Sequence, residues 1–353
     1  MADGRRVQDY EYDLPENLVA RYPAEERDAS RLLVVPRSGG PITDRPFREI
    51  PSLMAPGDVM VVNDSKVLPV RLKGRKPTGA PAEILLLRPA GGAEQGGADS
   101  LVWEALVRPG GKLKPGRNVA VGPDLDVEIL DSLEGGGRVV RLVTELAFQD
   151  VLARYGHVPL PPYLEREDEP LDRERYQTVY AEVPGSVAAP TAGLHFTTGL
   201  LASIDSIGVE RVSVTLDVGV GTFRPVDVDD PGQHTMHSER YCVPEATART
   251  VMNAKREGRR VWAVGTTVVR ALESATGESG VVEPRKGSTE LFIRPPYEFR
   301  AVDALVTNFH LPRSTLIMLV AAFGGYERTM NAYEEAIRLG FAFYSYGDSM
   351  AVT

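Results

Sequence analysis

Hydrophobic and polar positions follow two different patterns along the chain. Between residues 66 and 144 the apolar residues fall in short runs, separated by turn signals such as Pro109-Gly110-Gly111 and Gly135-Gly136-Gly137. Short strands at this spacing are typical of a small antiparallel barrel or sandwich. We therefore predict an inserted all-β domain over residues 66–144. Its expected strands are Val70–Lys73, Ala82–Leu87, Leu101–Val107, Asn118–Val121, Leu125–Ile129 and Val139–Val143.

Outside this segment, strand-like runs alternate with helical periods. The spacing of Phe148, Val151 and Leu152 predicts a helix that Thr144 caps and Gly156 ends. The alternation predicts a barrel-like mixed α/β main domain, formed by residues 1–65 and 145–353, with sites at the carboxyl ends of strands. Further expected elements are helices at Glu16–Arg21, Leu200–Ile207, Glu245–Glu257, Thr267–Ser274, Thr315–Phe323 and Thr329–Leu339, and strands at Arg31–Val35, Val59–Val62, Val209–Val218, Arg260–Val264, Glu290–Ile293, Ala304–Thr307 and Phe341–Tyr344.

Composition narrows the class of protein. The 353 residues are 42% hydrophobic and 25% charged, which is ordinary globular composition and more chain than one domain usually holds. The single cysteine, Cys242, excludes an internal disulfide framework and a cysteine zinc site. The first residues lack the apolar stretch of a signal peptide, and the longest apolar run, Leu316–Phe323, is far shorter than the ~20 residues of a membrane span. We expect a soluble, cytoplasmic protein.

Charge is distributed unevenly. The formal net charge of −9 argues against a protein that coats nucleic acid without specificity, yet residues 66–117 carry ten basic and four acidic residues. Arg71, Lys73 and Arg75 occupy alternate positions of a predicted strand, so we expect them to form a basic stripe on one face. This stripe is either part of a solvated edge strand or a surface that faces phosphates. The second reading is favoured, and the candidate RNA contacts are Arg71, Lys73, Arg75, Lys76, Lys112 and Lys114.

A glycine-rich segment follows one predicted strand. Asp217–Thr222 reads D-x-G-x-G-T, which resembles the start of a dinucleotide or S-adenosylmethionine methyltransferase site. The third glycine of that fingerprint is replaced by Phe223 or Arg224, and Pro225 follows. The methyltransferase signal is therefore weak, although a loop that brings its backbone close to a ligand remains expected.

Three histidine segments are candidate sites. His195 lies in a loop rich in small residues, and its expected titration near neutrality suits proton transfer; a purely structural loop is the alternative. His310 follows a predicted strand end, where catalysis and packing are equally plausible interpretations, and the same holds for the segment Tyr344–Asp348. His234, His237 and Glu239, in the pattern H-x-x-H-x-E, offer metal-ligand chemistry, but a surface loop is favoured, and we predict no metal site.

The order of the motifs resembles one family. The chain is similar to the S-adenosylmethionine:tRNA ribosyltransferase-isomerases of queuosine biosynthesis, from about residue 8 to its last residues. The blocks that carry the resemblance are Asp28–Leu33 (DASRLL), Asn63–Pro69 (NDSKVLP), Arg175–Tyr180 (RYQTVY), Val187–Thr197 (VAAPTAGLHFT), Gly219–Val226 (GVGTFRPV), Met236–Glu239 (MHSE), Val264–Ser274 (VGTTVVRALES) and Asn308–Leu319 (NFHLPRSTLIML).

The resemblance implies the substrates and the reaction. They are S-adenosylmethionine, consumed as a cosubstrate, and a tRNA carrying 7-aminomethyl-7-deazaguanine at the wobble position. The ribosyl unit moves to the aminomethyl nitrogen and rearranges, giving epoxyqueuosine, adenine and methionine. No recycled cofactor, no metal and no membrane partner are expected, and we predict a monomer.

The resemblance also indicates the neighbourhood of the site without settling roles. The reaction needs a base beside the sulfonium and an acid for the leaving adenine, and the candidate catalytic residues are His195, His310, Asp217 and Asp64. Asp217 stands where the resemblance leads us to expect a histidine, and we expect its ionised carboxylate to orient a neighbouring imidazole or raise its pKa. Candidate substrate-binding residues are Asn63, Thr191, Gly193, Gly219, Gly221, Thr222, His237, Glu239, Thr266, Arg270 and Asn308.

Two alternatives come from other classes of protein. One is a conventional S-adenosylmethionine-dependent tRNA methyltransferase, which would release S-adenosylhomocysteine. The other is a noncatalytic RNA-binding protein built around the basic segment, which would leave S-adenosylmethionine intact.

Overall fold

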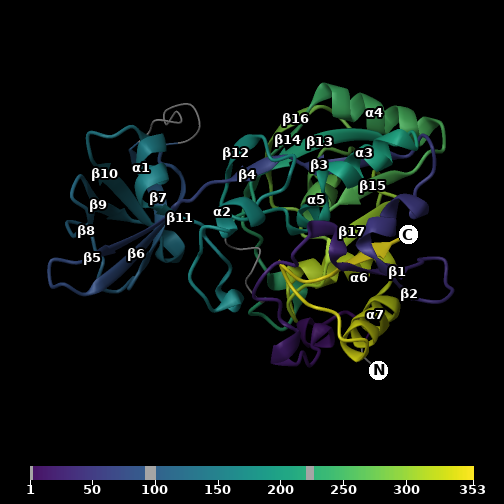
Figure 1. Ribbon diagram of the computed structural model, residues 1–353, viewed down its shortest axis with the longest axis horizontal. Coiled ribbons are helices and arrows are strands. Elements are labelled where there is room, and N and C mark those ends of the chain that lie inside the picture. The colour runs from purple at the N-terminus through teal and green to yellow at the C-terminus, as the bar shows by residue number, and fades with distance from the viewer. Residues whose placement is uncertain (1–2, 92–100, 220–225) are drawn as a thin grey trace. The chain divides into compact units, whose positions relative to one another are not determined.

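The chain is organised as two structural units. The computed structural model describes residues 3–91, 101–219 and 226–353 (Figure 1). The larger unit comprises Met1–Lys66, Pro161–Arg166 and Arg175–Thr353, and the smaller comprises Val67–Leu160 and Glu167–Glu174.

A mixed sheet of nine strands forms the centre of the larger unit. The strand order is β16-β14-β13-β3-β15-β17-β18-β1-β2. Strands β13, β3, β15 and β17 are mutually parallel, whereas β18 runs antiparallel to β17 and parallel to β1. The strands span β1 (Arg31–Val35), β2 (Thr43–Pro46), β3 (Val59–Asn63), β13 (Glu210–Leu216), β14 (Glu239–Val243), β15 (Val261–Val264), β16 (Arg285–Thr289), β17 (Ala304–Asn308) and β18 (Ser349–Val352), while β4 (Ser65–Val67) and β12 (Val183–Ser186) form a separate pair.

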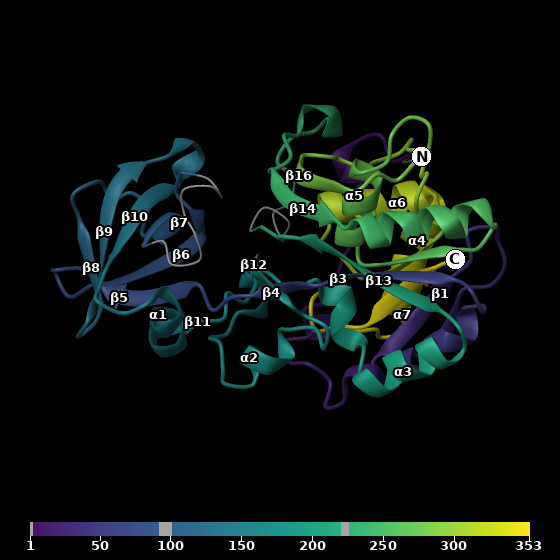
Figure 2. The same ribbon diagram turned by 90° about the horizontal axis from the view of Figure 1, so that it is seen from above.

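Both faces of the nine-stranded sheet are covered (Figure 2). Successive strand residues point to opposite faces, so Val59 and Val61 join one core while Met60 and Val62 join the other. Residues of α4–α7 pack in the first core, and α3 packs in the second beside the 3-10 helix Phe47–Leu53. This layering confirms the predicted mixed α/β class. The helices are α2 (Asp172–Arg175), α3 (Thr198–Ser206), α4 (Glu245–Arg256), α5 (Thr266–Ser274), α6 (Thr315–Gly324) and α7 (Tyr326–Arg338).

The smaller unit contains a closed antiparallel barrel, as the short apolar runs predicted. Six strands follow the order β5-β6-β7-β10-β9-β8, and the pairing of Arg75 with Ala120 closes the ring between β5 and β8. Thr144 does not cap α1; Ala147 holds that position, and the Thr144 hydroxyl donates to the Asp124 carbonyl. The elements are β5 (Arg71–Arg75), β6 (Pro81–Pro89), β7 (Val102–Arg108), β8 (Asn118–Gly122), β9 (Leu125–Ser132), β10 (Arg138–Val143), α1 (Phe148–Tyr155) and β11 (Gly156–His157).

Two predicted strands are wrong. The strand near Glu290–Ile293 lies instead at β16, whose residues are largely exposed and polar and therefore lack an apolar signal. The last strand is β18 and not Phe341–Tyr344. The predicted N-terminal helix is reduced to the 3-10 turn Glu16–Leu18. No helix in the described part of the chain is long and apolar enough to span a membrane.

Candidate active site

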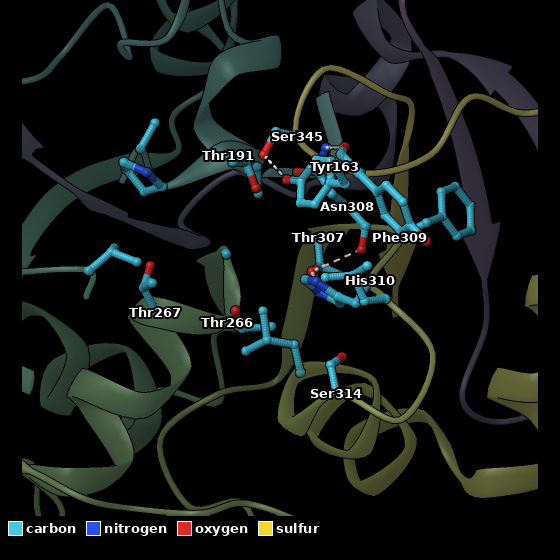
Figure 3. Close-up of a pocket in the computed structure, with 18 residues that line it drawn as sticks. Tyr163, Thr191, Thr266, Thr267, Thr307, Asn308, Phe309, His310, Ser314 and Ser345 are labelled. Atoms are coloured by element: carbon cyan, nitrogen blue, oxygen red, sulfur yellow. Dashed lines mark hydrogen bonds between the residues drawn. The ribbon is translucent and has the colours of Figure 1, made fainter. Parts of the chain in front are cut away.

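A pocket lies at the carboxyl ends of two neighbouring parallel strands, β15 and β17 (Figure 3). The segment Gly265–Thr267 follows β15, and Asn308–Leu311 ends and follows β17. Parallel strands place ligand-binding loops at this edge of a sheet, as the sequence analysis expected. The other lining residues are Tyr163, Ala189, Pro190, Thr191, Ala192, Val218, Thr307, Ser314, Leu316, Tyr344 and Ser345.

This pocket, called the main pocket below, is lined by side chains without formal charge at pH 7. Among the described residues that line it, none is Asp, Glu, Lys or Arg. Its polar groups are the Asn308 amide, the His310 imidazole and a set of hydroxyl groups. The hydroxyls belong to Tyr163, Thr191, Thr266, Thr267, Thr307, Ser314, Tyr344 and Ser345. Such a lining suits an uncharged polyol or heteroaromatic ring, which hydroxyls and an amide recognise through hydrogen bonds.

His310 is held by hydrogen bonds at both its side chain and its backbone. Its Nε2 lies 2.7 Å from the Thr307 hydroxyl, which itself donates to the Asn308 carbonyl at 3.4 Å. We assign the ring proton to Nε2 from the direction of this second hydrogen bond, and Nδ1 has no hydrogen-bond partner among the described residues. The His310 backbone N–H donates to the Tyr333 hydroxyl at 2.9 Å. Burial lowers the pKa of His310 to about 3, so the imidazole is neutral at pH 7.

His195 does not line the main pocket. It ends the 3-10 helix Thr191–His195 and lies between Asn308 and Ser30. The Asn308 Nδ2 donates to the Tyr344 carbonyl at 3.0 Å, which fixes the amide orientation, and it lies 3.2 Å from His195 Nε2. His195 Nε2 therefore accepts, and Nδ1–H donates to the Ser30 hydroxyl at 2.8 Å. Both ring nitrogens of His195 are occupied by protein groups.

The expected titration of His195 near neutrality is wrong. The side chain is 4% exposed and stacks on Phe47. Burial lowers its pKa to about 4; the Asn308 hydrogen bond raises that pKa and the nearby charge of Arg27 lowers it. A neutral imidazole with both nitrogens engaged favours a positioning role over direct proton transfer.

This shift predicts acid-sensitive stability. Unfolded protein protonates His195 below its ordinary pKa of 6.5, whereas the folded state resists protonation down to about 4. The contribution of neutral His195 to the free energy of unfolding is therefore complete above pH 6.5 and is lost as the pH falls toward 4. Between pH 7 and pH 4.5, we expect the free energy of unfolding in urea to fall by about 2 kcal/mol less in His195→Gln than in the unchanged protein. Equal losses in the two proteins would contradict the lowered pKa.

A second group of candidates forms a buried ion pair. Glu239 and Arg270 are 6% and 3% exposed, and the Arg270 Nη1 donates to Glu239 Oε2. The Glu239 Oε1 accepts from the Gly219 N–H at 3.0 Å, so this carboxylate holds the first glycine of the glycine-rich segment. Gly221 and Thr222 lie outside the described residues.

Asp217 contacts an arginine and no imidazole among the described residues. The Arg240 Nη2 donates to Asp217 Oδ2 at 2.9 Å. Burial raises the pKa of Asp217, and the charge of Arg240 lowers it. The expectation that this carboxylate orients a histidine is therefore not supported by its contacts.

Asn63 and Asp64 end β3 with hydrogen bonds that serve the fold. The Asn63 amide donates to the Leu216 carbonyl and accepts from the Leu216 N–H, both at 3.0 Å. The Asp64 carboxylate accepts from the Thr215 hydroxyl at 2.7 Å. These contacts tie β3 to β13 and place neither side chain in the main pocket.

Small residues are required where Gly193 passes a neighbouring segment. A Cβ at Gly193 would lie 2.1 Å from the Tyr180 hydroxyl, so only glycine fits. Gly193 thus shapes the loop that carries Thr191.

The candidate metal ligand His237 is exposed. The described residues contain no group of three His, Cys, Asp or Glu side chains able to hold a metal ion.

In the barrel unit, the predicted basic stripe exists but is partly neutralised. Arg71, Lys73 and Arg75 share one face of β5, as their alternation predicted. Arg71 pairs with Glu83 at 2.8 Å, and Lys73 pairs with Glu167. A groove of this unit is lined by three of the six candidates, Lys73, Arg75 and Lys76, and by one further basic residue, Arg108. Lys112 and Lys114 are exposed and do not line this groove.

Several pocket residues were missed in the sequence analysis. Tyr163 lines the main pocket, and its hydroxyl is hydrogen-bonded to that of Ser345, which belongs to the candidate segment Tyr344–Asp348 (Figure 3). Arg27 and Arg175 line a second pocket. Arg175 begins one of the quoted motifs and Arg27 directly precedes another, so the motif boundaries were the signal available.

Comparison with known proteins decides the family. The family described as queuosine biosynthesis protein matches residues 7–352. The chain belongs to this family. The resemblance stated from the motifs is thereby confirmed, and it covers nearly all of the chain.

Relatives of this queuosine biosynthesis family match the chain over its length. A protein of Symbiobacterium thermophilum is 49% identical over 98% of this chain and 99% of its own, and one of Thermus thermophilus is 50% identical over 97% and 98%. Both are named S-adenosylmethionine:tRNA ribosyltransferase-isomerase. The crystal structure of S-adenosylmethionine tRNA ribosyltransferase from Thermotoga maritima matches with a TM-score of 0.54 and 37% identity, over 98% of this chain and 99% of the other.

Proposed function

We propose that this protein is an S-adenosylmethionine:tRNA ribosyltransferase-isomerase of queuosine biosynthesis. It transfers and isomerises the ribosyl unit of S-adenosylmethionine onto 7-aminomethyl-7-deazaguanine at the tRNA wobble position. The products are epoxyqueuosine-tRNA, adenine and methionine. Full-length relatives of this name support the activity, and the neutral, hydroxyl-lined pocket beside His310 is the observation that supports its location.

The main pocket suits the nucleoside part of S-adenosylmethionine. Its hydroxyls match ribose and adenine edges, and its neutral lining leaves a bound sulfonium without a competing cation. The sulfonium acidifies the adjacent 5′ carbon, so a neutral base beside it is required. We assign this role to His310, whose Nδ1 keeps an available lone pair.

The low pKa of His310 keeps the imidazole neutral before the reaction and makes it, once protonated, a strong acid. The imidazole is neutral at pH 7 and accepts the proton released from the 5′ carbon. Once protonated, it is a stronger acid than an ordinary imidazolium, so it passes the proton readily to a ring nitrogen of the departing adenine. The aminomethyl nitrogen of the tRNA base attacks the ribosyl unit and loses its own proton to solvent. Methionine leaves when the bond between the 5′ carbon and sulfur breaks, with the electron pair going to sulfur as the epoxide oxygen bonds to that carbon skeleton.

The activity is tested by following the released products. We expect adenine and methionine in equal amounts, and only when tRNA bearing the aminomethyl base is supplied. Unmodified tRNA is the control. Release of S-adenosylhomocysteine would contradict the proposal and indicate a methyltransferase; no consumption of S-adenosylmethionine would indicate a noncatalytic RNA-binding protein.

We further propose that the barrel unit contacts tRNA through its basic groove. Arg75 and Lys76 lie at the groove with Arg108, and none of the three has a carboxylate partner among the described residues. Replacing all three with Ala should weaken tRNA binding and lower the slope of log affinity against log salt by roughly 0.7–0.9 per lost contact. The matched control removes three exposed positive charges of the larger unit, at Arg249, Arg256 and Lys286. Equal slopes in both triple variants would contradict a role for the groove.

We also propose that the protein acts as a cytoplasmic monomer with S-adenosylmethionine as a consumed cosubstrate. Light scattering of the purified protein tests the monomer, and a dimer mass would contradict it.

A further inference from the structure

A groove lined with arginines lies at one edge of the nine-stranded sheet of the larger unit. Strand β2 is the last strand of that sheet, next to β1 (Figure 1). The groove, called the arginine groove below, has a volume of about 510 Å³. Three guanidinium groups and one carboxylate line it, so its net charge is positive. The lining residues are Ala29, Arg31, Asp44, Arg45, Pro46 and Arg48.

Asp44 is the only carboxylate among the described residues that line the arginine groove, and Arg31 engages it. The Arg31 Nε and Nη2 donate to Asp44 Oδ1 and Oδ2 at 3.3 and 2.5 Å. The Arg31 Nη1 donates to the Leu339 carbonyl at 3.0 Å, and the guanidinium lies 3.8 Å from the ring centroid of Phe341. Because this two-bond pair offsets the charge of Asp44, the other two arginines decide what the groove attracts.

Arg45 and Arg48 have no carboxylate partner among the described residues. The Arg45 Nη1 donates to the Ser52 hydroxyl at 3.4 Å, and a neutral hydroxyl leaves the guanidinium charge uncancelled. Arg48 is exposed, and its side chain makes no hydrogen bond to a described residue. A guanidinium offers a fork of N–H donors that matches two oxygens of a phosphate, so this pair of arginines fits phosphate groups.

The strand register places the arginine groove at the same edge of the sheet as the main pocket. Asn308 of β17 lies opposite Ser349 of β18, which in turn lies opposite Leu32 of β1. Leu32 lies opposite Arg45 of β2. Asn308 lines the main pocket and Arg45 lines the groove, and three strand spacings of ~4.8 Å separate their backbones by about 14 Å.

We propose that the arginine groove binds the sugar–phosphate backbone of the tRNA substrate through Arg45 and Arg48. This inference rests on the proposed function, because that function brings one nucleoside of a tRNA to the main pocket. RNA carries a phosphate at every nucleotide, so the backbone beside that nucleoside reaches the groove within a few nucleotides. The second pocket adjoins the groove, since Ser30 lines the pocket and Ala29 lines the groove. A backbone contact contributes affinity and orientation without reading the base.

Equilibrium binding of tRNA tests the arginine groove without catalysis. In the double variant Arg45→Gln with Arg48→Gln we expect the Kd for unmodified tRNA to rise about 10-fold, because two charged contacts to phosphate are lost. The slope of log affinity against log salt should fall by roughly 0.7–0.9 for each contact. Arg45→Lys with Arg48→Lys keeps both charges and should retain the slope. Arg249→Gln with Arg256→Gln, two exposed arginines of α4, is the control for loss of charge.

A salt slope equal to that of the α4 control would overturn the proposal. A raised Kd at an unchanged slope would overturn it as well, because the effect would then not come from phosphate charge. If the double variant unfolds by circular dichroism, Arg48→Gln alone replaces it, with an expected fall in slope of roughly 0.7–0.9. The proposed function is tested separately, by adenine release from the unchanged protein. A groove that binds tRNA in a protein that releases no adenine would contradict only the reaction.

Discussion

Replacement of His310 by Gln is expected to lower kcat by about 10²–10⁴-fold, the usual contribution of a general acid–base residue. His310 is the imidazole that lines the main pocket, and its Nδ1 has no hydrogen-bond partner among the described residues. Glutamine keeps a polar group of similar length but cannot carry a proton between two substrate atoms. The KM for S-adenosylmethionine should change little, since the hydroxyl lining remains. Single-turnover release of adenine at saturating tRNA measures the effect.

Two other histidines sharpen this test. His195 has both nitrogens engaged by Asn308 and Ser30, so His195→Gln should cost less in kcat and more in KM than His310→Gln. His157 hydrogen-bonds to Asp168 in the barrel unit, and His157→Gln is the control for a histidine outside the pocket. The lowered pKa of His310 also predicts that kcat shows no inflection near pH 6.5. A kcat for His310→Gln within threefold of the unchanged protein would remove His310 from proton transfer.

The sequence predicts this fold best at buried elements, because their apolar residues form continuous runs or a regular pattern. β1 and β3 are nearly continuous apolar runs, and their bounds differ from the prediction by at most one residue. β16 lies at a sheet edge, where exposed Arg285 and Lys286 carry no such record. Phe341 and Phe343 are fully buried and looked like a strand, yet they pack against Phe309 from an irregular segment.

Candidate site residues were predicted by type more easily than by role. His310, Thr191, Thr266 and Asn308 all come from the quoted motifs, and the structure brings them into one pocket. The motifs do not reveal that both ring nitrogens of His195 are hydrogen-bonded to protein groups, because these bonds join segments that are far apart in the sequence. Arg27 was overlooked for the same reason, because the second pocket that it lines is formed by segments that are far apart in the sequence.

Breaking the Glu239–Arg270 ion pair should have the largest effect on stability. Both side chains are at least nine-tenths buried, so removing one partner leaves an uncompensated charge in the interior. Such a loss typically costs about 3–5 kcal/mol in the free energy of unfolding. We expect Arg270→Met to show this loss in urea unfolding. It also removes the Arg270 Nε hydrogen bond to the Leu291 carbonyl, which lies 3.1 Å away.

A double variant separates the ion pair from simple loss of packing. Glu239→Leu with Arg270→Met replaces both charges by apolar side chains, so the buried unpaired charge disappears and much of the stability should return. The exposed pair of Arg249 and Glu245 is the control, where Arg249→Met should change the free energy of unfolding by no more than about 0.5 kcal/mol. A double variant no more stable than Arg270→Met would mean that the cost comes from packing or from the Gly219 N–H left without Glu239. The double variant could also recover its stability without recovering adenine release. That result would show that Glu239 and Arg270 hold Gly219 in place for catalysis, because the fold would be intact while the hydrogen bond from the Gly219 N–H to Glu239 is lost.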